Sequence, residues 1–519
     1  MLQALFSMNW EALVVASVFG EGAARICAVV ATARAADFRI LVRKALRETP
    51  TVELRLDWLA NDRERHSALD WLKRSVDRQA VFIATCRRRI AGGEFVGNAV
   101  EQLFWLMRAK EAGCAWCDLE IETLRELPEK SVAGYAIPSK VLLSIHNFRR
   151  TPKLPPAAKI PKYGGVEAIK VAAMSESLAD SLRLLRLARG SRQIVAIPMG
   201  EVGLPGRILA LRAGSALVYA PIAAATAPGQ VPLHELRDLY RAHQLTPKSE
   251  VFGVIGNPIS HSLSPALHNS GFIAAEKDAV LLPFLVERLA EFVKAIPEFG
   301  LKGFCVTLPH KTAILGYLDD CDALAEEIGA VNTVTVTRRG RLLGSNTDYI
   351  GVLRALESHM KLKHSRVLLY GAGGAARAAA FAVARAGAEV LVCARRDEAA
   401  RRLARAVHGG VVRHASLRRE KFDAILNATP MGMHPHPGSS PLKSEELNCG
   451  LVMDLIYRPL ETKLLRIAAK KGIRTVSGVE MFLAQGIVQW QHWMRSRAPD
   501  KAMRKAVLEK LQADERHWR

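Results

Sequence analysis

Between Ile26 and Ala220 the sequence alternates eight times between a short strand-like run and, in most cases, a segment long enough for a helix. The runs are ICAVVAT, TVELRLDWL, AVFIATC, WCDLEIE, KVLLSIHNF, AIKVAAM, QIVAIPMG and ALVYAPI. Parallel strands need a crossover connection, and a helix between successive strands supplies it. Eight such units are typical of a (β/α)8 barrel. We therefore predict an α/β fold that has a barrel over residues 21–244, preceded by an N-terminal extension over residues 1–20.

Several of these runs alternate apolar and charged residues, so each strand has one polar face. The charged positions are Glu53, Arg55 and Asp57 in the second run and Asp118, Glu120 and Glu122 in the fourth. The fifth run carries His146, and in the sixth Lys170 stands between Ala168 and Ala172. A barrel interior is normally filled by branched apolar side chains, so inward charges of both signs predict a polar site at its mouth.

Lys170 is the residue with the clearest chemical use in this half. A lysine in a strand is most often an edge residue with its ammonium group in water. Burial and cationic neighbours instead favour the neutral amine, which attacks a ketone to form a Schiff base. The iminium then acidifies the neighbouring carbon, and His146 on the preceding strand is the candidate base. Glu120, one strand earlier, is the candidate to orient the imidazole.

Four segments of this half, DLEIE, SIHNFRRTP, IKVAAM and TAPGQ, resemble class I 3-dehydroquinate dehydratase over about residues 25–240. The resemblance implies a Schiff base on Lys170, with His146 as acid and base in the elimination of water. It also implies substrate-holding roles for Glu53, Arg55, Arg87, Arg207, Thr226 and Gln230. Arg207 would bind the substrate carboxylate as a bidentate fork. Thr226 stands where relatives often have serine, and it keeps the hydroxyl.

The pattern restarts after the polar hinge LTPKSE, and RVLLYGAGGAARAAAFAVARAGAEVLVCARR predicts a strand, a glycine-rich loop, a helix and a second strand. This is the order of a dinucleotide-binding fold, with Ala376 in place of the third glycine. The predicted cofactor loop contains Gly371, Gly373, Gly374 and Ala375. The second strand ends without an acidic residue and is followed by Arg395 and Arg396. Cations at this place favour a 2′-phosphate, so the predicted cofactor is NADP.

The second half contains five further motifs, GFCVTLPHK, GAVNTVTV, GSNTDYIG, NATPMGM and GVEMFLAQ. Together they resemble shikimate dehydrogenase over about residues 250–500. The resemblance implies that Lys311 and Asp348 serve the proton transfer that accompanies hydride transfer. The implied substrate-binding residues are Ser262, Ser264, Thr307, Asn332, Tyr457 and Gln485, and Asn427 and Thr429 would lie along the cofactor. Ser262 and Ser264 precede a predicted helix, where hydroxyl groups suit a carboxylate. Cys305 stands where many relatives have asparagine or serine, and a thiol is a weaker hydrogen-bonding group.

The predicted domains of this half are a substrate domain over 250–350, completed by C-terminal helices over 478–500, and an NADP-binding domain over 351–477. Residues 501–519 are predicted to be a basic tail. Dehydratase product and dehydrogenase substrate are both 3-dehydroshikimate, so the two resemblances together predict a fused enzyme that makes shikimate. One alternative is a quinate/shikimate dehydrogenase acting oxidatively with NAD. The other is a ligand-sensing regulator without catalysis, against which the intact Lys170, His146, Lys311 and Asp348 argue.

The chain of 519 residues carries a formal net charge of +22. Such a charge attracts nucleic acid or anionic substrates. Because the basic residues are scattered along the whole chain, we predict small-molecule partners and no nucleic acid. The single CxxC motif, CAWC, has no second pair or matching histidines, so no metal site is predicted. The first twenty residues lack a basic leader, and the uncharged stretch 213–233 is broken by prolines, so we expect a cytoplasmic protein without a membrane span.

Overall fold

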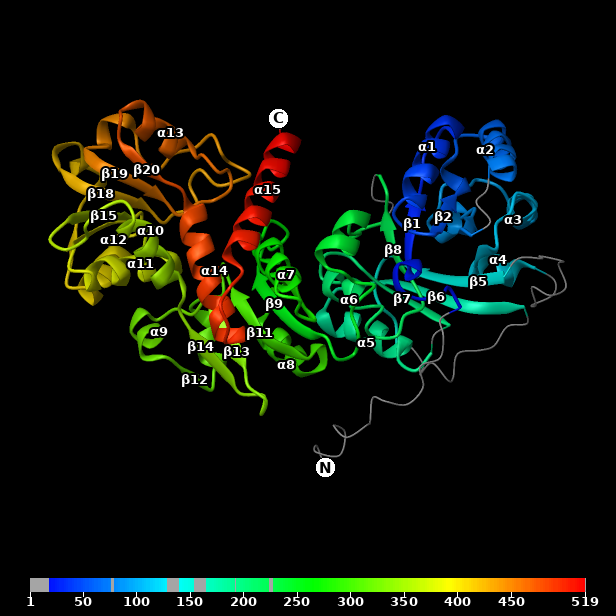
Figure 1. Ribbon diagram of the computed structural model, residues 1–519, viewed down its shortest axis with the longest axis horizontal. Helices are drawn as coiled ribbons and strands as arrows, with labels where there is room; N and C mark the ends of the chain where they lie inside the picture. Colours follow the sequence, from blue (N-terminus) through cyan, green and yellow to red (C-terminus); the bar gives the residue numbers. More distant parts are fainter. Residues whose placement is uncertain are drawn as a thin grey trace. The chain divides into compact units, whose positions relative to one another are not determined.

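The computed structural model describes residues 18–75, 79–127, 140–153, 165–191, 193–223 and 227–518. The chain divides between Ser249 and Glu250 into two compact units, which are described separately below (Figure 1). Thr226 and residues 1–17 of the predicted N-terminal extension lie outside the described residues.

The first unit is built on an eight-stranded parallel sheet with the strand order β7-β6-β5-β4-β3-β2-β1-β8. Its strands are β1 (Ile26–Val30), β2 (Thr51–Arg55), β3 (Val81–Thr85), β4 (Trp116–Glu120), β5 (Lys140–Asn147), β6 (Val166–Met174), β7 (Ile194–Met199) and β8 (Val218–Pro221). Strand β1 pairs with both β2 and β8, which curls the sheet into a nearly closed barrel. The predicted barrel fold is confirmed, with one strand in each of the eight predicted runs.

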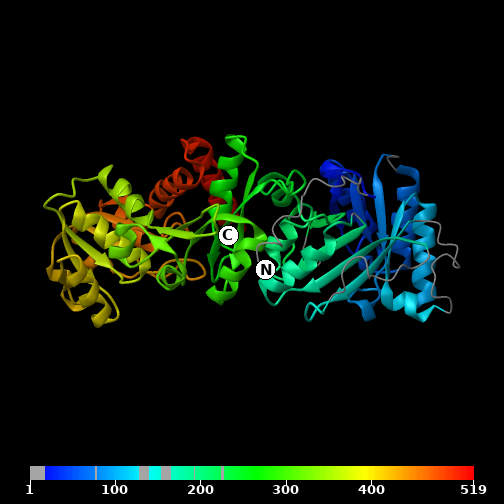
Figure 2. The same cartoon turned by 90° about the horizontal axis from the view of Figure 1, so that it is seen from below.

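Helices connect the strands and lie outside them, as Figures 1 and 2 show. They are α1 (Ala35–Leu46), α2 (Asp62–Ser75), α3 (Ala99–Glu111), α4 (Ile121–Glu126), α5 (Leu178–Ala188) and α6 (Leu204–Ile208). Two of the predicted inward charges are not on strands. Asp57 lies in a 3-10 helix over Leu56–Trp58, and Glu122 lies in α4. The alternation ends because the chain turns away at the carboxyl edge of the barrel immediately after Arg55 and Glu120.

The second unit contains two six-stranded sheets. The first has the order β10-β9-β11-β13-β14-β12 and is mixed, because β13 runs antiparallel to both β11 and β14. Its strands are β9 (Glu250–Gly256), β10 (Ala279–Leu285), β11 (Leu301–Val306), β12 (Asp320–Cys321), β13 (Thr333–Val336) and β14 (Leu342–Ser345). Its helices are α7 (Ser264–Ala274), α8 (Leu289–Phe299), α9 (Ala323–Ile328), α14 (Gly478–Met494) and α15 (Asp500–Trp518).

Helix α15 corrects the predicted basic tail over 501–519. Met503, Val507 and Leu511 are spaced by four residues and therefore share one helix face. All three are buried in the same apolar cluster as Phe272 of α7 and Trp490 of α14. The charged residues that suggested a tail lie on the other faces of this helix.

The second sheet is parallel throughout, with the order β17-β16-β15-β18-β19-β20. Its strands are β15 (Arg366–Tyr370), β16 (Glu389–Cys393), β17 (Gly410–Val411), β18 (Phe422–Asn427), β19 (Cys449–Asp454) and β20 (Arg474–Val476), and its helices are α10 (Asp348–Glu357), α11 (Gly374–Arg385), α12 (Asp397–Ala406) and α13 (Lys463–Lys470). Helices α11 and α12 cover the face that carries Val367, and α13 covers the face that carries Leu368. This strand order and two-sided covering are those of a doubly wound dinucleotide fold. The predicted Rossmann fold is confirmed.

Candidate active sites

Lys170 of β6 lies at the centre of a buried charge cluster inside the barrel and is only 2% exposed. Its ammonium group contacts the carboxylate of Asp118 from β4, and Glu53 Oε1 from β2 lies 3.6 Å from Nζ. Nζ also lies 4.7 Å from the centre of the Tyr219 ring. Our sequence analysis expected cationic neighbours, but the nearest charged groups are carboxylates. These carboxylates hold the Lys170 side chain inside the barrel by charge-assisted contacts.

Arg87, two residues after β3, joins Asp118 to Glu120. Its Nη2 lies 3.3 Å from Asp118 Oδ2, and its Nε lies 3.4 Å from Glu120 Oε1. Burial of Asp118 is outweighed by Lys170 and Arg87, so the pKa of this carboxyl is lowered. Burial raises the pKa of Glu120 to about 7, against the effect of Arg87. The Asp118 carboxylate is therefore held in its ionised form, whereas the neighbouring Glu120 carboxyl titrates near neutrality.

His146 lies near the end of β5, and its partner across the ladder is Ala172 of β6. Burial, followed by the charges of Arg87 and Lys170, lowers the pKa of this imidazole well below its ordinary value. Within the described residues, His146 Nδ1 has no hydrogen-bond partner. Glu120 does not orient the ring here, because its carboxylate contacts Gln102 of α3 and Arg87 instead. The structure thus places a neutral imidazole one strand away from Lys170.

The other predicted barrel residues fall into two groups. Glu53 accepts a hydrogen bond from Thr85 Oγ1 at 2.8 Å, and Arg55 forms a bidentate pair with Asp57 at 2.9 and 2.7 Å. Arg207 of α6 is buried and donates to the carbonyl groups of Pro198 and Pro228, and burial lowers the pKa of its guanidinium to about 10. Gln230 accepts from the backbone of Ala227 at 3.2 Å. The described contacts join Glu53 and Arg87 to the Lys170 cluster but do not join Arg207 or Gln230 to it.

A cavity of about 130 Å³ in the second unit lies beside the ends of β11 and β13 and helix α14. All eight predicted catalytic and substrate-binding residues of this unit line it, namely Ser262, Ser264, Thr307, Lys311, Asn332, Asp348, Tyr457 and Gln485. Lys311 Nζ lies 2.5 Å from Asp348 Oδ2, and Asn332 Nδ2 donates to Asp348 Oδ1 at 2.8 Å. Asn332 and Lys311 therefore hold the two carboxylate oxygens of Asp348 in fixed directions.

Cys305 also lines this cavity, and its sulfur is part of a hydrogen-bond chain. Its Sγ lies 3.4 Å from Gln489 Oε1, and Gln489 Nε2 donates to Thr333 Oγ1 at 3.0 Å. Burial raises the pKa of the thiol to about 12, so it stays neutral. The sequence analysis missed Gln489, although it follows Gln485 by four residues and therefore shares its helix face.

A second, more open cavity of about 610 Å³ lies at the glycine-rich loop after β15. Gly371 has φ +123°, and an added Cβ would lie 3.0 Å from the Ala428 carbonyl oxygen, so the loop requires glycine there. Three arginines line this cavity, Arg377, Arg396 and Arg402. A cluster of guanidinium groups at a glycine-rich loop fits a phosphorylated dinucleotide.

The predicted cofactor-binding residues differ in their position relative to this cavity. Arg395 and Arg396 are both exposed, and of the two only Arg396 lines the cavity. Arg377 was missed although it follows Gly374 by three residues on the helix that the loop opens, and Arg402 was missed because only the packing of α12 brings it to this loop. Asn427 is buried, donates to Asp454 Oδ1 at 3.0 Å and accepts from Thr429 Oγ1 at 2.7 Å. These bonds hold the loop after β18 and occupy the polar groups that the sequence analysis assigned to the cofactor.

Comparison with known proteins identifies a relative that matches both units. The bifunctional 3-dehydroquinate dehydratase/shikimate dehydrogenase, chloroplastic, of Arabidopsis thaliana is 33% identical over 476 residues, which cover 86% of this chain and 78% of that protein. The chain belongs to this bifunctional family. Two protein-family models also match this chain. Residues 26–247 match the model for type I 3-dehydroquinase, and residues 254–334 match the model for the shikimate dehydrogenase substrate binding domain.

The dehydrogenase half of this bifunctional family member is also similar to single-function proteins. Shikimate dehydrogenase (NADP(+)) of Bacillus cereus is 44% identical over 275 residues, covering 50% of this chain and 99% of that protein. A crystal structure of shikimate 5-dehydrogenase from Thermus thermophilus in complex with NADP(H) and shikimate is 36% identical, covers 50% of this chain and 99% of that chain, and has a TM-score of 0.47.

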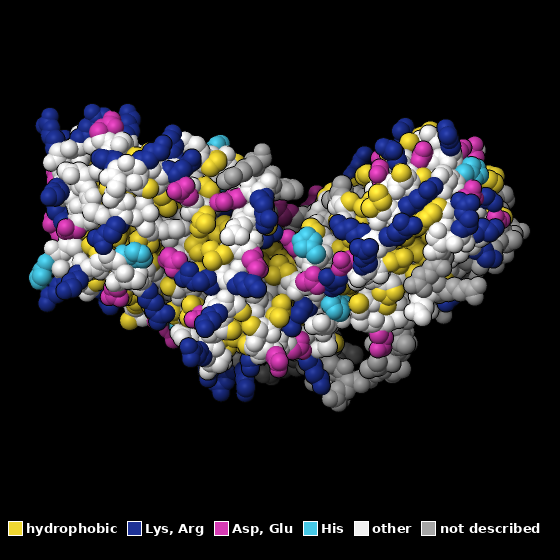
Figure 3. Space-filling model, turned by 45° about the horizontal axis from the view of Figure 1, so that its top comes forward, with side chains coloured by type: hydrophobic (Ala, Val, Ile, Leu, Met, Phe, Trp, Pro, Cys, Tyr) yellow, Lys and Arg dark blue, Asp and Glu magenta, His cyan; other side chains and the backbone are white. Residues whose placement is uncertain are grey.

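Other features of this family member concern its surface and its cysteines. In the part of the chain that the structure describes, no helix is both long and apolar enough to cross a membrane, and no group of side chains is arranged to hold a metal ion. On the face shown in Figure 3, lysine and arginine side chains are scattered among acidic ones. Cys114 and Cys117 of the CxxC motif are both buried, which agrees with a packing role.

Proposed function

We propose that the chain catalyses two consecutive reactions. The barrel dehydrates 3-dehydroquinate to 3-dehydroshikimate, and the second unit reduces 3-dehydroshikimate to shikimate with NADPH. The observation that carries this proposal is the Arabidopsis relative, whose similarity runs through both units, combined with a separate set of catalytic side chains in each. Residues 21–244 are the proposed dehydratase domain. Residues 250–350 with α14 are the proposed shikimate-binding domain, and 351–477 the proposed NADP-binding domain.

In the barrel, Lys170 Nζ adds to the substrate ketone, and loss of one water gives an iminium. His146, neutral because its pKa is lowered, takes a proton from the adjacent carbon. The electron pair moves into the iminium, and the β-hydroxyl group then leaves with the proton from His146 as a second water. Hydrolysis of the imine returns Lys170 and releases the enone. Asp118 and Glu53 hold the Lys170 side chain in place, and Arg87, Arg55 and Arg207 are the proposed partners of the substrate oxygens.

In the second unit, bound NADPH supplies a hydride to the substrate carbonyl carbon. The loop at Gly371–Gly374 and the arginines at the open cavity are the groups that would hold the cofactor. Lys311 donates the accompanying proton to the carbonyl oxygen and regains one from water, and Asp348 holds the Lys311 amino group in position through their 2.5 Å contact. Ser262 and Ser264, at the start of α7, are the proposed partners of the substrate carboxylate.

The experiment that tests this proposal supplies 3-dehydroquinate and NADPH together to the purified chain. We expect oxidation of NADPH and formation of shikimate at matching rates, with 3-dehydroshikimate accumulating when NADPH is left out. Absence of shikimate, with folded protein and both reactants present, would refute the bifunctional assignment.

Cofactor preference is expected to depend on Arg396. Replacing Arg396 by alanine should raise the KM for NADPH by about 10-fold or more, because a charge-assisted contact to the 2′-phosphate is lost. The KM for NADH should change little, since NADH has no phosphate at that position. Arg405→Ala, on the helix α12 that Arg396 caps but outside the cavity wall, is the control. An equal loss for both cofactors would contradict the assignment, and Arg395→Ala measures whether its exposed neighbour contributes.

The pH dependence of the dehydratase follows from the lowered pKa of His146. A base is active above its pKa and is lost as pH falls through it. Because the pKa lies well below the ordinary 6.5, the acid limb of kcat/KM assigned to His146 should also lie well below 6.5. The measurement is a pH profile of 3-dehydroquinate turnover in wild-type and Glu120→Gln protein. A limb near pH 7 that disappears in Glu120→Gln would report the Glu120 carboxyl instead.

We also propose a cytoplasmic location for this chain, with small molecules as its substrates. None of the eight cysteines is in a disulfide bond, which fits a reducing compartment. The Arabidopsis relative is described as chloroplastic, so cell fractionation in the source organism is the test that separates the two locations.

A further inference from the structure

Gln102 of α3 is a buried amide that reaches the barrel carboxylate Glu120, and neither proposed reaction gives it a role. Its Nε2 donates a hydrogen bond to Glu120 Oε2. Its Oε1 accepts a hydrogen bond from Thr123 Oγ1 of α4 at 2.6 Å. Gln102, Thr123 and Glu120 are all 0% exposed, so these contacts lie away from solvent. A buried amide that has a partner at each of its two ends is held in one place.

The orientation of this amide is set by Arg88, the residue after Arg87. Arg88 Nε donates to Thr123 Oγ1 at 3.1 Å, and Arg88 Nη1 lies 2.8 Å from Glu126 Oε2. A guanidinium group can only donate, so the Thr123 hydroxyl accepts from Arg88 and donates its own hydrogen to Gln102. The amide oxygen therefore faces Thr123, and the amide NH2 group faces the carboxylate. Successive donors polarise one another, which strengthens the last hydrogen bond of the chain.

Glu120 is a carboxyl group whose charge depends on small changes around it. Burial raises its pKa, Arg87 lowers it, Asp118 raises it, and the hydrogen bond from Gln102 lowers it, which together give a pKa of about 7. The titratable groups that surround it are Arg87, Asp118, Cys86 and Cys117. Because a donor favours the charged form, loss of the Gln102 amide would leave less Glu120 ionised at neutral pH.

The charge of Glu120 affects the proposed base His146 through Arg87. Arg87 Nε lies 3.4 Å from Glu120 Oε1. Burial and then the charge of Arg87 lower the pKa of His146. An ionised Glu120 offsets the charge of Arg87, whereas a protonated Glu120 leaves that charge uncompensated. His146 is then a weaker base for the proton next to the substrate ketone.

We propose that Gln102 is a positioning residue of the dehydratase site, which holds the Glu120 carboxylate in its ionised form. Arg88 and Thr123 orient the Gln102 amide for this task. The inference rests on the proposed dehydratase function and adds to it a residue of α3 that acts through Glu120.

Infrared spectroscopy of the full chain measures the protonation of Glu120 independently of turnover. The band of the protonated carboxyl group is identified as the one that Glu120→Gln removes, and it is followed as the pH is raised through neutrality. We expect a midpoint near 7 in the wild-type chain. Gln102→Leu should raise this midpoint by about one pH unit or more, because the charged form loses a hydrogen bond. Thr123→Val should raise it by a smaller amount and tests the chain even if Gln102→Leu does not fold.

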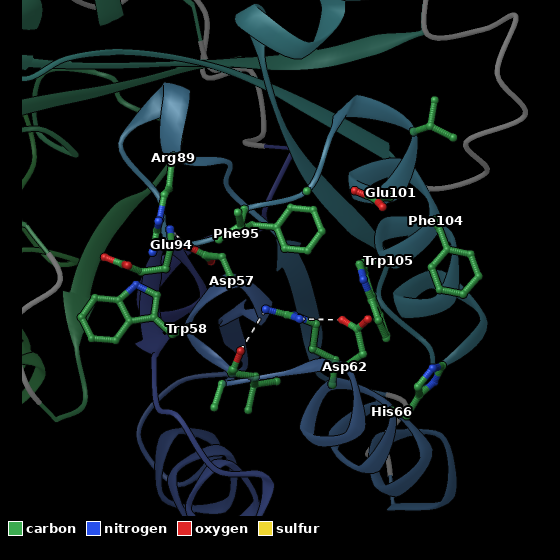
Figure 4. Close-up of a pocket in the computed structure, with 16 residues that line it drawn as sticks. Asp57, Trp58, Asp62, His66, Arg89, Glu94, Phe95, Glu101, Phe104 and Trp105 are labelled. Carbon is green, nitrogen blue, oxygen red and sulfur yellow. Dashed lines mark hydrogen bonds and ion pairs between the residues drawn. The ribbon is translucent and has the colours of Figure 1, made fainter.

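The matched control introduces leucine at another position of α3. Glu101 and Phe104 line a groove of about 840 Å³ (Figure 4), and Gln102 is not among the described residues that line it. Phe104 is 49% exposed, so Phe104→Leu should leave the Glu120 midpoint unchanged. Circular dichroism verifies that each variant is folded.

The pH profile of dehydratase kcat tests the link to the reaction. At neutral pH the kcat of Gln102→Leu should fall by about 10-fold, and it should recover as the pH rises past the new midpoint of Glu120. A purely structural defect would lower kcat at every pH.

The proposal is overturned if the midpoint stays at its wild-type value in both Gln102→Leu and Thr123→Val, or if Phe104→Leu shifts it equally. A shifted midpoint with an unshifted kcat profile overturns it as well. A wild-type chain that does not dehydrate 3-dehydroquinate would refute the proposed function, and the infrared midpoints would still decide whether Gln102 controls the charge of Glu120.

Discussion

Replacing Lys170 by alanine is expected to lower dehydratase turnover by roughly 10,000-fold or more, the scale seen when a covalent nucleophile is removed. Without the amine there is no iminium to accept the electron pair, so the proton next to the ketone stays weakly acidic. Shikimate dehydrogenase activity of the same protein should be unchanged, because its catalytic side chains lie in the second unit. Turnover of 3-dehydroquinate and of shikimate in the same preparation measures both effects.

Trapping with borohydride tests the covalent step directly. Borohydride added with 3-dehydroquinate should reduce the iminium and leave a stable mass on the peptide that holds Lys170. Lys170→Ala should show no adduct, while His146→Ala should still form it slowly, because the imidazole acts after imine formation. Lys140→Ala is the matched control, since Lys140 is an exposed lysine at the start of the neighbouring strand β5. A substrate mass absent from the Lys170 peptide of the wild-type chain would refute the mechanism.

Much of the barrel was predictable, because strand and helix alternate regularly and each strand has only two faces. The inward position of Lys170 follows from the period of two, which puts it on the same face as Ala168 and Ala172, and the structure buries it inside the barrel. The alternation of faces did not predict the residue at which each strand ends. Asp57 keeps the period of two in the sequence but lies in a 3-10 helix, from which its carboxylate reaches back to pair with Arg55.

Contacts between elements distant in sequence were the less predictable part of both sites. Gln102 lies on the inner face of α3, where it looks like an ordinary core position, yet it donates to Glu120. That contact, with Arg87, replaces the Glu120–His146 pair that strand order alone suggested. Arg402 likewise has no motif, since its position at the cofactor cavity depends on how α12 packs on the sheet, whereas Arg377 lies within the glycine-rich segment itself. The last helix forms despite its basic sequence, because Met503 and Val507 are buried in the apolar core.

Lys311 gives the second large expected effect. Lys311→Met should lower shikimate dehydrogenase kcat by roughly 1,000-fold, which is within the range of general acid–base contributions. Methionine is the sharper replacement than alanine because the Lys311 stem packs beside Gly374, where an added Cβ would lie 3.2 Å from Lys311 Cβ. Keeping an unbranched stem preserves that contact with the cofactor loop, so the loss measures the ammonium group. The KM for NADPH should accordingly change little.

Dehydratase activity in the Lys311→Met chain should remain close to wild type, because Asp118, Glu53 and Tyr219, which surround Lys170, all belong to the first unit. Lys302→Met, an exposed lysine in β11, controls for the removal of one charge. Asp348→Asn should reproduce most of the Lys311→Met loss, since an amide still fills the place beside Asn332 but no longer provides the negative charge that holds the Lys311 amino group. If a folded Lys311→Met protein lost both activities together, the two reactions would share a site. If it lost neither, proton transfer would have to come from another group in the cavity.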